Sequence, residues 1–255
     1  MLGDFLRGAT YVPRGLRMLN TVGLRRYVWL PVVVNVLVFA GLFWIGADWL
    51  QSLMNYLVPE PAEIRVEGWL GAILDFLVVA ARWLLWPLFL LMAFVVMFYT
   101  FTAVANLIGS PFNGMLSARV EAQVTGRLPR EASGGGLFVD ALGAIRDELR
   151  KIAYFVLLAA PLLILFFVPV ANLLTSPLWL LYGAWIMALE YMDYPLGNRG
   201  IAFKEQRRLV RGRRMLHLGF GAGLLAITLI PVANLIAMPT GVIGATLLRL
   251  EQGER

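Results

Sequence analysis

The chain contains no cysteine and a single histidine, His217, and both shortages exclude particular kinds of chemistry. Without cysteine there can be no disulfide, thiol nucleophile or thiolate metal site. One histidine cannot build a multi-histidine metal site, and no Ser/His/Asp triad can be recognised around it. The G-x-x-x-x-G-K-[ST] motif that holds nucleotide phosphates is also missing. We therefore predict that the protein is not an enzyme and has no catalytic residues, metal or cofactor.

Charged residues are scarce as well. They make up 15% of the 255 residues, whereas 60% are hydrophobic and the mean hydropathy is +0.74, which is too apolar for a soluble domain of this length. The sequence therefore predicts an all-α integral membrane protein, with residues 1–255 forming a single membrane domain. The net charge of +6 suits nucleic acid in principle. In membrane proteins, however, excess arginine mainly sets the topology, so we expect no nucleic-acid partner.

The N-terminal segment is rich in arginine. Residues 1–26 carry five arginines among scattered apolar residues, a pattern typical of an amphipathic segment that lies in the membrane interface. Pro13 is expected to interrupt the helical pattern. No apolar run leads to a small-residue cleavage site, so we do not expect a cleaved signal peptide. We predict that residues 1–26 form an interfacial N-terminal segment.

Two long apolar runs follow, at 27–46 and 69–108. The first holds 20 residues without a charge, and at about 1.5 Å per residue it matches a hydrocarbon core of about 30 Å. The second is about twice as long as one crossing needs and carries Asp75 and Arg82 near its start. We predict that both runs are spanning helices. Asp75 and Arg82 would share one helix face, either lining an aqueous path or lying near the outer headgroups.

One block, Val-Ala-Asn-Leu, occurs three times, each time followed four residues later by proline. Asparagine prefers turns and caps, and proline lacks the backbone N–H, so each copy is predicted to interrupt a helix at membrane depth. Broken backbone there must be satisfied by protein or by a water-filled cavity. The copies therefore either line a transport path or are the turns of helical hairpins. They start at Val104, Val170 and Val232, and end at Pro111, Pro177 and Pro239.

The distribution of lysine and arginine predicts the topology. Five lie in 1–26, one in 47–68, six in 113–151 and seven in 193–214, so the positive-inside rule places only the 47–68 loop outside. The apolar blocks 152–192 and 215–250 must then begin and end in the cytoplasm, yet their arms of about 11 to 17 residues are at or below the minimum length for a crossing. We predict two spanning helices, a cytoplasmic helical segment at 113–151 with a glycine joint at 134–136, and two half-penetrating (re-entrant) helical hairpins. The alternative is a six-span helical bundle.

The motif Gly23-Leu24-Arg25-Arg26 directly precedes the first spanning helix. Glycine permits a tight turn, the first N–H groups of a helix point toward the preceding loop, and two guanidiniums offer planar donor arrays that suit a tetrahedral oxyanion. Positive-inside topology, however, places arginines beside spanning helices in any case. The residues alone leave both interpretations open.

A second candidate site extends the first copy of the repeat. Polar donors where a helix restarts suit a pore lining, although they also suit an ordinary turn with an asparagine cap. We expect the following residues to face a pathway: Asn106, Ser110, Asn113, Arg119 and Glu121.

Three motifs together resemble the CysZ family of bacterial sulfate permeases, over nearly the whole chain. The second and third motifs together are fairly specific, and the first alone is not. The family's Asp-Tyr-Pro segment often continues with Asn-His, whereas this chain has Asn198-Arg199, so no histidine role is carried over. The motifs are Gly23-Leu24-Arg25-Arg26 with Leu30-Pro31 and Asn35; Ala105-Asn106-Leu107-Ile108 with Ser110-Pro111-Phe112-Asn113-Gly114; and Tyr191-Met192-Asp193-Tyr194-Pro195-Leu196 with Asn198 and Phe203.

The resemblance implies a multi-pass protein of the bacterial inner membrane that imports sulfate for cysteine biosynthesis, as a transporter or channel. Its implied partners are sulfate, the lipid bilayer and further copies of itself in a homo-oligomer. The resemblance also implies that sulfate binds at Gly23, Leu24, Arg25 and Arg26. The alternative is a non-transporting membrane scaffold or regulator, whose basic cytoplasmic segment at 204–214 binds a protein partner or anionic lipids.

Overall fold

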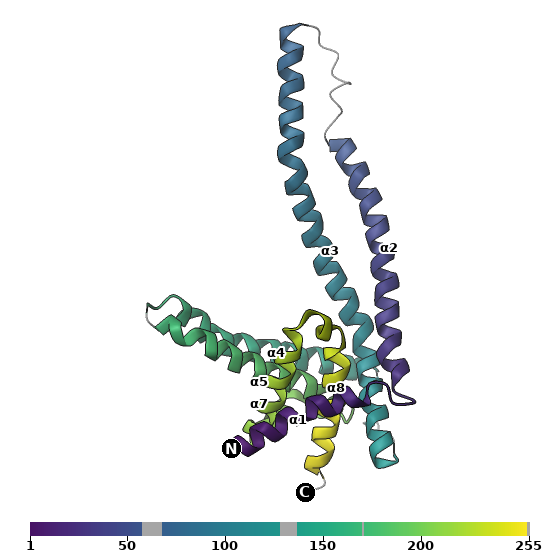
Figure 1. Cartoon of the computed structure of the whole chain (residues 1–255), viewed down its shortest axis with the longest axis vertical. Helices are drawn as coiled ribbons and strands as arrows, with labels where there is room; N and C mark the ends of the chain where they lie inside the picture. The colour runs from purple at the N-terminus through teal and green to yellow at the C-terminus, as the bar shows by residue number, and fades with distance from the viewer. Residues whose placement is uncertain (58–67, 128–136, 170, 254–255) are drawn as a thin grey trace. The chain divides into compact units, whose positions relative to one another are not determined.

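The computed structural model describes residues 1–57, 68–127, 137–169 and 171–253. Within these ranges all regular structure is helical, as predicted. The glycine joint predicted at 134–136 lies outside the described residues, as do residues 58–67 of the predicted outer loop. Figure 1 shows the helices in chain order: α1 (Leu2–Met18), α2 (Arg25–Leu57), α3 (Trp69–Thr125), α4 (Leu137–Phe166), the short 3-10 helix η2 (Ala171–Leu174), α5 (Thr175–Gly197), α6 (Phe203–Gly212), α7 (Arg214–Thr228) and α8 (Pro231–Gly253).

The chain divides into two compact units. Unit 1 comprises Met1–Trp29 and Pro111–Arg255, and unit 2 comprises Leu30–Ser110. Unit 1 therefore contains α1, the first turn of α2, the last part of α3 and all later helices. Unit 2 contains the remaining parts of α2 and α3.

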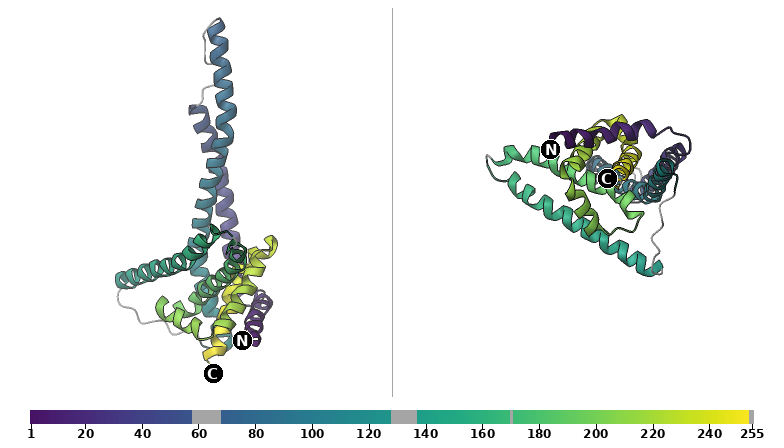
Figure 2. Two further views of the ribbon diagram at one scale, coloured as in Figure 1. Left: turned by 90° about the vertical axis from the view of Figure 1, so that its left-hand side faces the viewer. Right: turned by 90° about the horizontal axis from the view of Figure 1, so that it is seen from below.

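In unit 1, α1 lies across α7 and α8 (Figure 2). Glycines let α1 and α7 approach closely. A Cβ atom at Gly8 would lie 1.9 Å from the carbonyl oxygen of Leu216, and one at Gly219 would lie 1.9 Å from that of Phe5. Only hydrogen fits at these two positions, so the helix crossing depends on glycine.

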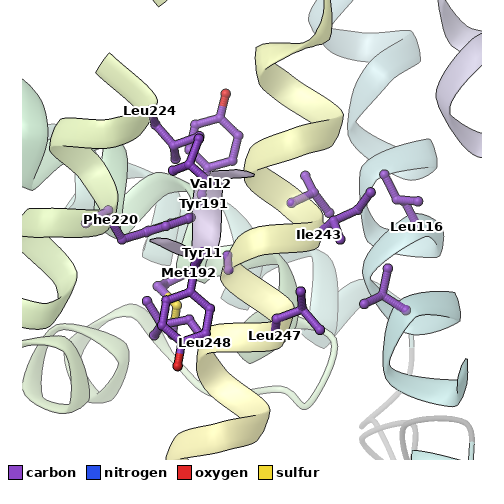
Figure 3. Close-up of a cluster of buried hydrophobic side chains, with 14 of the residues drawn as sticks. Tyr11, Val12, Leu116, Tyr191, Met192, Phe220, Leu224, Ile243, Leu247 and Leu248 are labelled. Carbon is purple, nitrogen blue, oxygen red and sulfur yellow. The ribbon is translucent and has the colours of Figure 1, made fainter. Parts of the chain in front are cut away.

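The core of unit 1 fills the space between these helices (Figure 3). Tyr11 of α1, Met192 of α5, Phe220 of α7 and Leu248 of α8 are almost completely buried in it, and Leu116 brings the last part of α3 into the same cluster. Burying a large apolar side chain contributes about 1.5 to 3 kcal/mol, so this cluster holds five helices together.

The prediction that Pro13 interrupts the N-terminal helix is wrong, because α1 continues through it. One face of α1 is buried against α7 and α8, including Tyr11 and Val12, while Pro13 itself is exposed. A proline inside a helix costs about 3 kcal/mol, and burial of the opposite face offsets that cost. The exposed side chains of Leu6 and Leu16 remain consistent with an interfacial segment.

α4 and α5 form a hairpin around the second copy of the repeat. The helical path is broken between Phe166 and Thr175, so the predicted interruption is confirmed for this copy. The two helices run side by side in opposite directions (Figure 1), and the hydroxyl of Tyr182 donates a hydrogen bond to the carbonyl of Phe155 at 3.1 Å. Asn172 lies in η2, at the tip of this hairpin.

α7 and α8 form a second hairpin, but its turn precedes the third copy of the repeat. The turn consists of Leu229 and Ile230. Asn234 already belongs to the first turn of α8, and its N–H donates to the carbonyl of Ile230 at 2.8 Å. The prediction that this copy itself breaks the helix is wrong. The helix instead starts at Pro231, because the first helical position tolerates the missing N–H of proline.

The first copy of the repeat does not break a helix either. α3 runs from Trp69 to Thr125 over 57 residues, so it passes through Asn106 and Pro111 and continues into the segment predicted to be separate at 113–151. A proline inside the helix costs one hydrogen bond and a clash with the preceding turn. A complete break in an apolar environment would leave several backbone polar groups without partners, which costs more.

Unit 2 exposes large apolar side chains along both of its helices, which run in opposite directions (Figure 1). Trp44 of α2 and Trp83 of α3 are 76% and 79% exposed. Surfaces of this kind require an apolar environment or a partner. Two helices in the described residues are long and apolar enough to span a membrane, at Arg25–Trp49 on α2 and Ile145–Phe166 on α4.

These two candidate spans agree only in part with the prediction. The first matches the predicted span at 27–46. The second lies in α4 and overlaps both the predicted cytoplasmic segment 113–151 and the predicted hairpin 152–192, whereas the described part of α3 shows only the shorter apolar stretches Trp69–Ala80 and Trp86–Val96. Charged residues occupy the start of the α4 candidate, and its uncharged run covers only residues 152–166. The number of crossings therefore stays a prediction.

Candidate functional site

The loop before α2 makes the tight turn that its glycine was predicted to allow. Gly23 has a φ angle of +90°, a left-handed conformation that strains residues with a side chain. Leu24 is completely buried in the core of unit 1, whereas Arg25 and Arg26 are exposed. The leucine therefore anchors the loop, and the two guanidiniums remain accessible to a ligand.

The end of α3 holds the loop in place from the other side. The side-chain amide of Gln123 donates a hydrogen bond to the carbonyl of Val22 at 2.8 Å. A Cβ atom at Gly23 would lie 3.2 Å from the same amide nitrogen. Glycine at this position therefore permits both the turn and the close approach of Gln123.

Backbone donors are available where α2 begins. The N–H groups of Leu24 and Arg25 both donate to the carbonyl of Thr21, at 3.0 and 3.3 Å. Among the described residues, the N–H groups of Gly23 and Arg26 have no backbone acceptor. Unpaired N–H groups and the helix dipole both favour an anion at a helix N-terminus.

A third arginine joins this loop. Arg26 and Arg119 both donate hydrogen bonds to the hydroxyl of Tyr27, at 3.1 and 3.3 Å. The guanidinium of Arg26 also lies 4.8 Å from the centre of the Tyr27 ring. Tyr27 thus brings two guanidiniums from different helices together beside the start of α2. We define the arginine site as Gly23, Leu24, Arg25, Arg26 and Arg119.

Arg119 and Glu121, which were predicted to share a pathway, point to different neighbours. Glu121 is buried and forms ion pairs with Arg199, just beyond the end of α5, and with Arg249 of α8; the contact to Arg249 measures 3.5 Å. Residues two apart on a helix point in nearly opposite directions. The spacing in the sequence therefore already indicates that the two side chains lie on different faces of α3. Arg119 belongs to the arginine site and does not share the surroundings of Glu121.

Asn113 lies on the same side of α3 as Glu121. It is buried, and its amide donates to the hydroxyl of Tyr194 on α5 at 3.4 Å. One turn further along, Ser117 is also buried and shares a hydrogen bond of 2.9 Å with Thr246 of α8. The last part of α3 therefore presents a row of polar side chains to α5 and α8.

Asn106 and Ser110 lie on the continuous helix α3, but their side chains are outside the described part of the structure. Their part in a pathway therefore stays a prediction. The polar stripe that the structure describes consists of Asn113, Ser117 and Glu121, which lie four residues apart on the last part of α3 and so share one face.

Sequence reasoning missed the partners of these side chains. Tyr27, Arg199 and Arg249 were not predicted as site residues, although each makes a contact described above. Tyr27 directly follows the two predicted arginines, so its position alone was a usable signal. Arg199 marks the place where the chain departs from the Asn-His of the resembling family.

The known proteins that this chain is similar to are named as sulfate transporters. The model of the family described as sulfate transporter CysZ/etoposide-induced protein 2.4 matches residues 11–239. A sulfate transporter CysZ from Pseudomonas paraeruginosa is 39% identical over 253 residues, which cover 98% of this chain and 97% of that protein. Sulfate transporter CysZ from a Pseudomonas aeruginosa strain shows the same identity and coverage. Its namesake from Pseudomonas fluorescens is 37% identical, covering 97% of this chain and 94% of the relative.

Proposed function

This chain belongs to the sulfate transporter CysZ/etoposide-induced protein 2.4 family, and we propose that it is a bacterial inner-membrane transporter or channel that imports sulfate for cysteine biosynthesis. The relatives are named as transporters and not as enzymes. The exposed apolar surface of α2 and α3 supports a membrane location. Since the sequence has no nucleotide-binding P-loop, transport would depend on a gradient or on another protein.

Sulfate binds at the arginine site in this proposal. The single observation that supports it best is the convergence of Arg26 and Arg119 on Tyr27, beside the backbone donors at the start of α2. A sulfate ion has four oxygen acceptors and two negative charges. Planar guanidiniums and helix N–H groups are the donors that match such an ion.

The proposed topology is multi-pass, with two crossings by α2 and α3 and two half-penetrating hairpins. Two observations support the hairpins. Their tips carry exposed apolar side chains, including Phe167 and Leu229 at 81% and 70% exposure. The uncharged run of α4 covers residues 152–166, which is shorter than the about 20 residues that a crossing needs.

The polar stripe on α3 lines the sulfate path in this proposal. Buried polar side chains need water or a protein partner. Asn113 has such a partner in Tyr194 on α5, and Glu121 has two, Arg199 just beyond the end of α5 and Arg249 on α8. Homo-oligomeric assembly belongs to the same proposal, and its support is the family resemblance.

The decisive experiment measures uptake of radiolabelled sulfate into sealed vesicles that contain the purified protein. We expect uptake above that of protein-free vesicles. The variant R25A/R26A should bind sulfate about 3 kcal/mol more weakly by calorimetry, which is about 150-fold, if each arginine contributes one charge-assisted contact of about 1.5 kcal/mol.

The matched control is R208A/R213A, which removes the same charge from exposed arginines of a different segment. It should retain the sulfate affinity of the wild type. If the folded R25A/R26A variant binds sulfate as tightly as the wild type, the site assignment fails. If the wild type shows no uptake, the transport function fails.

A further inference from the structure

The aromatic ring of Tyr154 on α4 holds two arginines of α6. The guanidinium carbon of Arg207 lies 4.8 Å from the centre of this ring and that of Arg211 lies 5.9 Å from it. The two arginines are four residues apart on α6, so they project from the same face. Cation–π contacts of this kind restrict where the guanidiniums lie.

The ring itself is held firmly. The hydroxyl of Tyr154 accepts a hydrogen bond of 2.9 Å from the indole N–H of Trp185 on α5. The ring also makes an edge contact with Phe203 at the start of α6, with 5.9 Å between the ring centres. Because α4, α5 and α6 all contribute, the position of the two arginines is set before any ligand binds.

The positive charge of this pair is not neutralised within the described structure. Among the described residues, no carboxylate lies within 4.0 Å of Arg207 or Arg211, whereas their neighbour Arg208 pairs with Glu205 at 3.7 Å. Two fixed guanidiniums without a counter-ion suit a phosphate group, because the planar N–H groups of both can donate hydrogen bonds to its oxygens.

An apolar stripe on α4 begins at the same ring. Tyr154, Leu157, Pro161 and Ile164 are separated by three, four and three residues, so they share one face of the helix. Leu157 and Ile164 are 72% and 68% exposed, and Pro161 is also exposed. At about 1.5 Å per residue the stripe is about 15 Å long, which equals one leaflet of a hydrocarbon core of about 30 Å.

The boundary between charge and apolar sequence lies at this point of the chain. Arg150 and Lys151 are the last charged residues of α4, and Tyr154 stands in the first turn of the uncharged run. Tyrosine at such a boundary is typical of the membrane interface. A ligand at Arg207 and Arg211 therefore meets the polar side of the interface, and the stripe continues into the apolar side.

We propose that Arg207 and Arg211, held in place by the ring of Tyr154, bind the phosphate headgroup of an anionic phospholipid, whose acyl chain lies along Leu157, Pro161 and Ile164. The charge complementarity and the apolar stripe favour a lipid over a soluble phosphate, which would use only the arginines. This lipid site is separate from the arginine site at α2 and does not depend on sulfate transport.

The test measures lipid binding to the full-length protein by native mass spectrometry, with phosphatidylglycerol and phosphatidylcholine as probes. We expect tighter binding of phosphatidylglycerol. The variant R207Q/R211Q should weaken it by about ten-fold or more, because both charge-assisted contacts to the phosphate are lost. The control R208Q/R213Q removes two charges from the same basic segment without touching Tyr154, and it should change the affinity by less than about two-fold.

Three outcomes would overturn the proposal. Equal weakening in both double variants would show diffuse attraction by the basic segment, and no weakening in either would show that there is no site. Displacement of phosphatidylglycerol by excess inorganic phosphate would show a soluble-anion site.

Y154L keeps both charges and should still weaken binding several-fold, whereas Y154F keeps the ring and should not.

A sulfate measurement on the same samples separates this proposal from the proposed function. R207Q/R211Q should keep the wild-type sulfate affinity by calorimetry. If the wild type itself fails to bind sulfate, the lipid measurements remain interpretable, because they use no sulfate.

Discussion

Arg119 of α3 donates a hydrogen bond to the hydroxyl of Tyr27 on α2, 3.3 Å away. The two residues are 92 positions apart in the chain, yet this contact places a third arginine beside the Gly23-Leu24-Arg25-Arg26 loop. The same hydroxyl also accepts a hydrogen bond from Arg26 at 3.1 Å. The arginine site is therefore assembled by the fold of unit 1, and not by the loop alone.

The first prediction concerns Arg119. If it contacts sulfate, R119A should weaken sulfate binding by about five-fold, which corresponds to about 1 kcal/mol for one additional charged contact in a partly exposed site. Calorimetry on the purified protein measures this directly. The control R119K keeps the charge and should lose less affinity. Wild-type affinity in R119A would show that Arg119 only supports Tyr27.

The second prediction concerns the buried carboxylate of Glu121. E121Q leaves Arg199 and Arg249 without their shared counter-ion. We expect a loss of about 2 kcal/mol in the free energy of unfolding. This is less than for a fully buried pair, because Arg199 is 39% exposed. The matched control is E205Q, whose ion pair with Arg208 is exposed, and it should have almost no effect. Denaturant unfolding measures the free energy of unfolding of both variants. Equal stability of the two would contradict a structural role for Glu121.

The helix breaks could be predicted only in part, and the sequence explains why. The copies of the repeat at Asn172 and Asn234 are each preceded by a proline, Pro169 or Pro231, whereas the first copy is preceded by Ala103. A proline at the start of a helix disfavours helical conformation in the residue before it. Both hairpin turns lie beside this additional proline, and α3 continues where it is missing. The proline before the block therefore marks these turns better than the block itself does.

The arginine loop could be predicted because its chemistry is local. Gly23, Arg25 and Arg26 lie within four residues of one another, so neither a fold nor a partner had to be known. Glu121 is different, since its partners Arg199 and Arg249 are 78 and 128 positions away. The chain has 22 lysines and arginines, and nothing in the periodicity of the sequence selects these two. Contacts of this range follow from the packing of α3 against α5 and α8.

The third prediction tests the hairpins. Since the chain has no cysteine, N172C and N234C each introduce one thiol, at a hairpin tip or just after one. We expect neither to react with a membrane-impermeant maleimide applied outside intact cells, because half-penetrating tips do not reach the outer surface. S52C, in the segment predicted to be outside, should react, and R213C, in a cytoplasmic segment, should not. Labelling of N172C or N234C from outside would support the six-span bundle.

The fourth prediction is a pH dependence at the contact between α1 and α8. Hydrogen bonds from Arg14, Tyr11 and Arg7 lower the pKa of Glu251 to about 2, against about 4.3 in an unfolded chain. A lowered pKa means that the carboxylate stabilises the fold above pH 4.3, and that this stabilisation is lost as the pH falls toward 2. Thermal melts of wild type and E251Q should therefore differ at pH 6 and converge as the pH approaches 2. A constant difference would rule out this contact as the cause.

The last prediction concerns Asn106 of α3. An unbroken helix has no need of asparagine for a turn at Asn106, so the structure removes the simplest structural reason for this residue. If Asn106 faces the sulfate path, as the sequence predicts, N106L should reduce uptake into vesicles several-fold while leaving sulfate affinity at the arginine site nearly unchanged. N234L changes the equivalent residue of the third copy, which is exposed in the first turn of α8, and it should transport normally. Since leucine favours a helix more than asparagine does, a folding defect in N106L is not expected. Wild-type uptake by a folded N106L variant would show that Asn106 does not face the sulfate path.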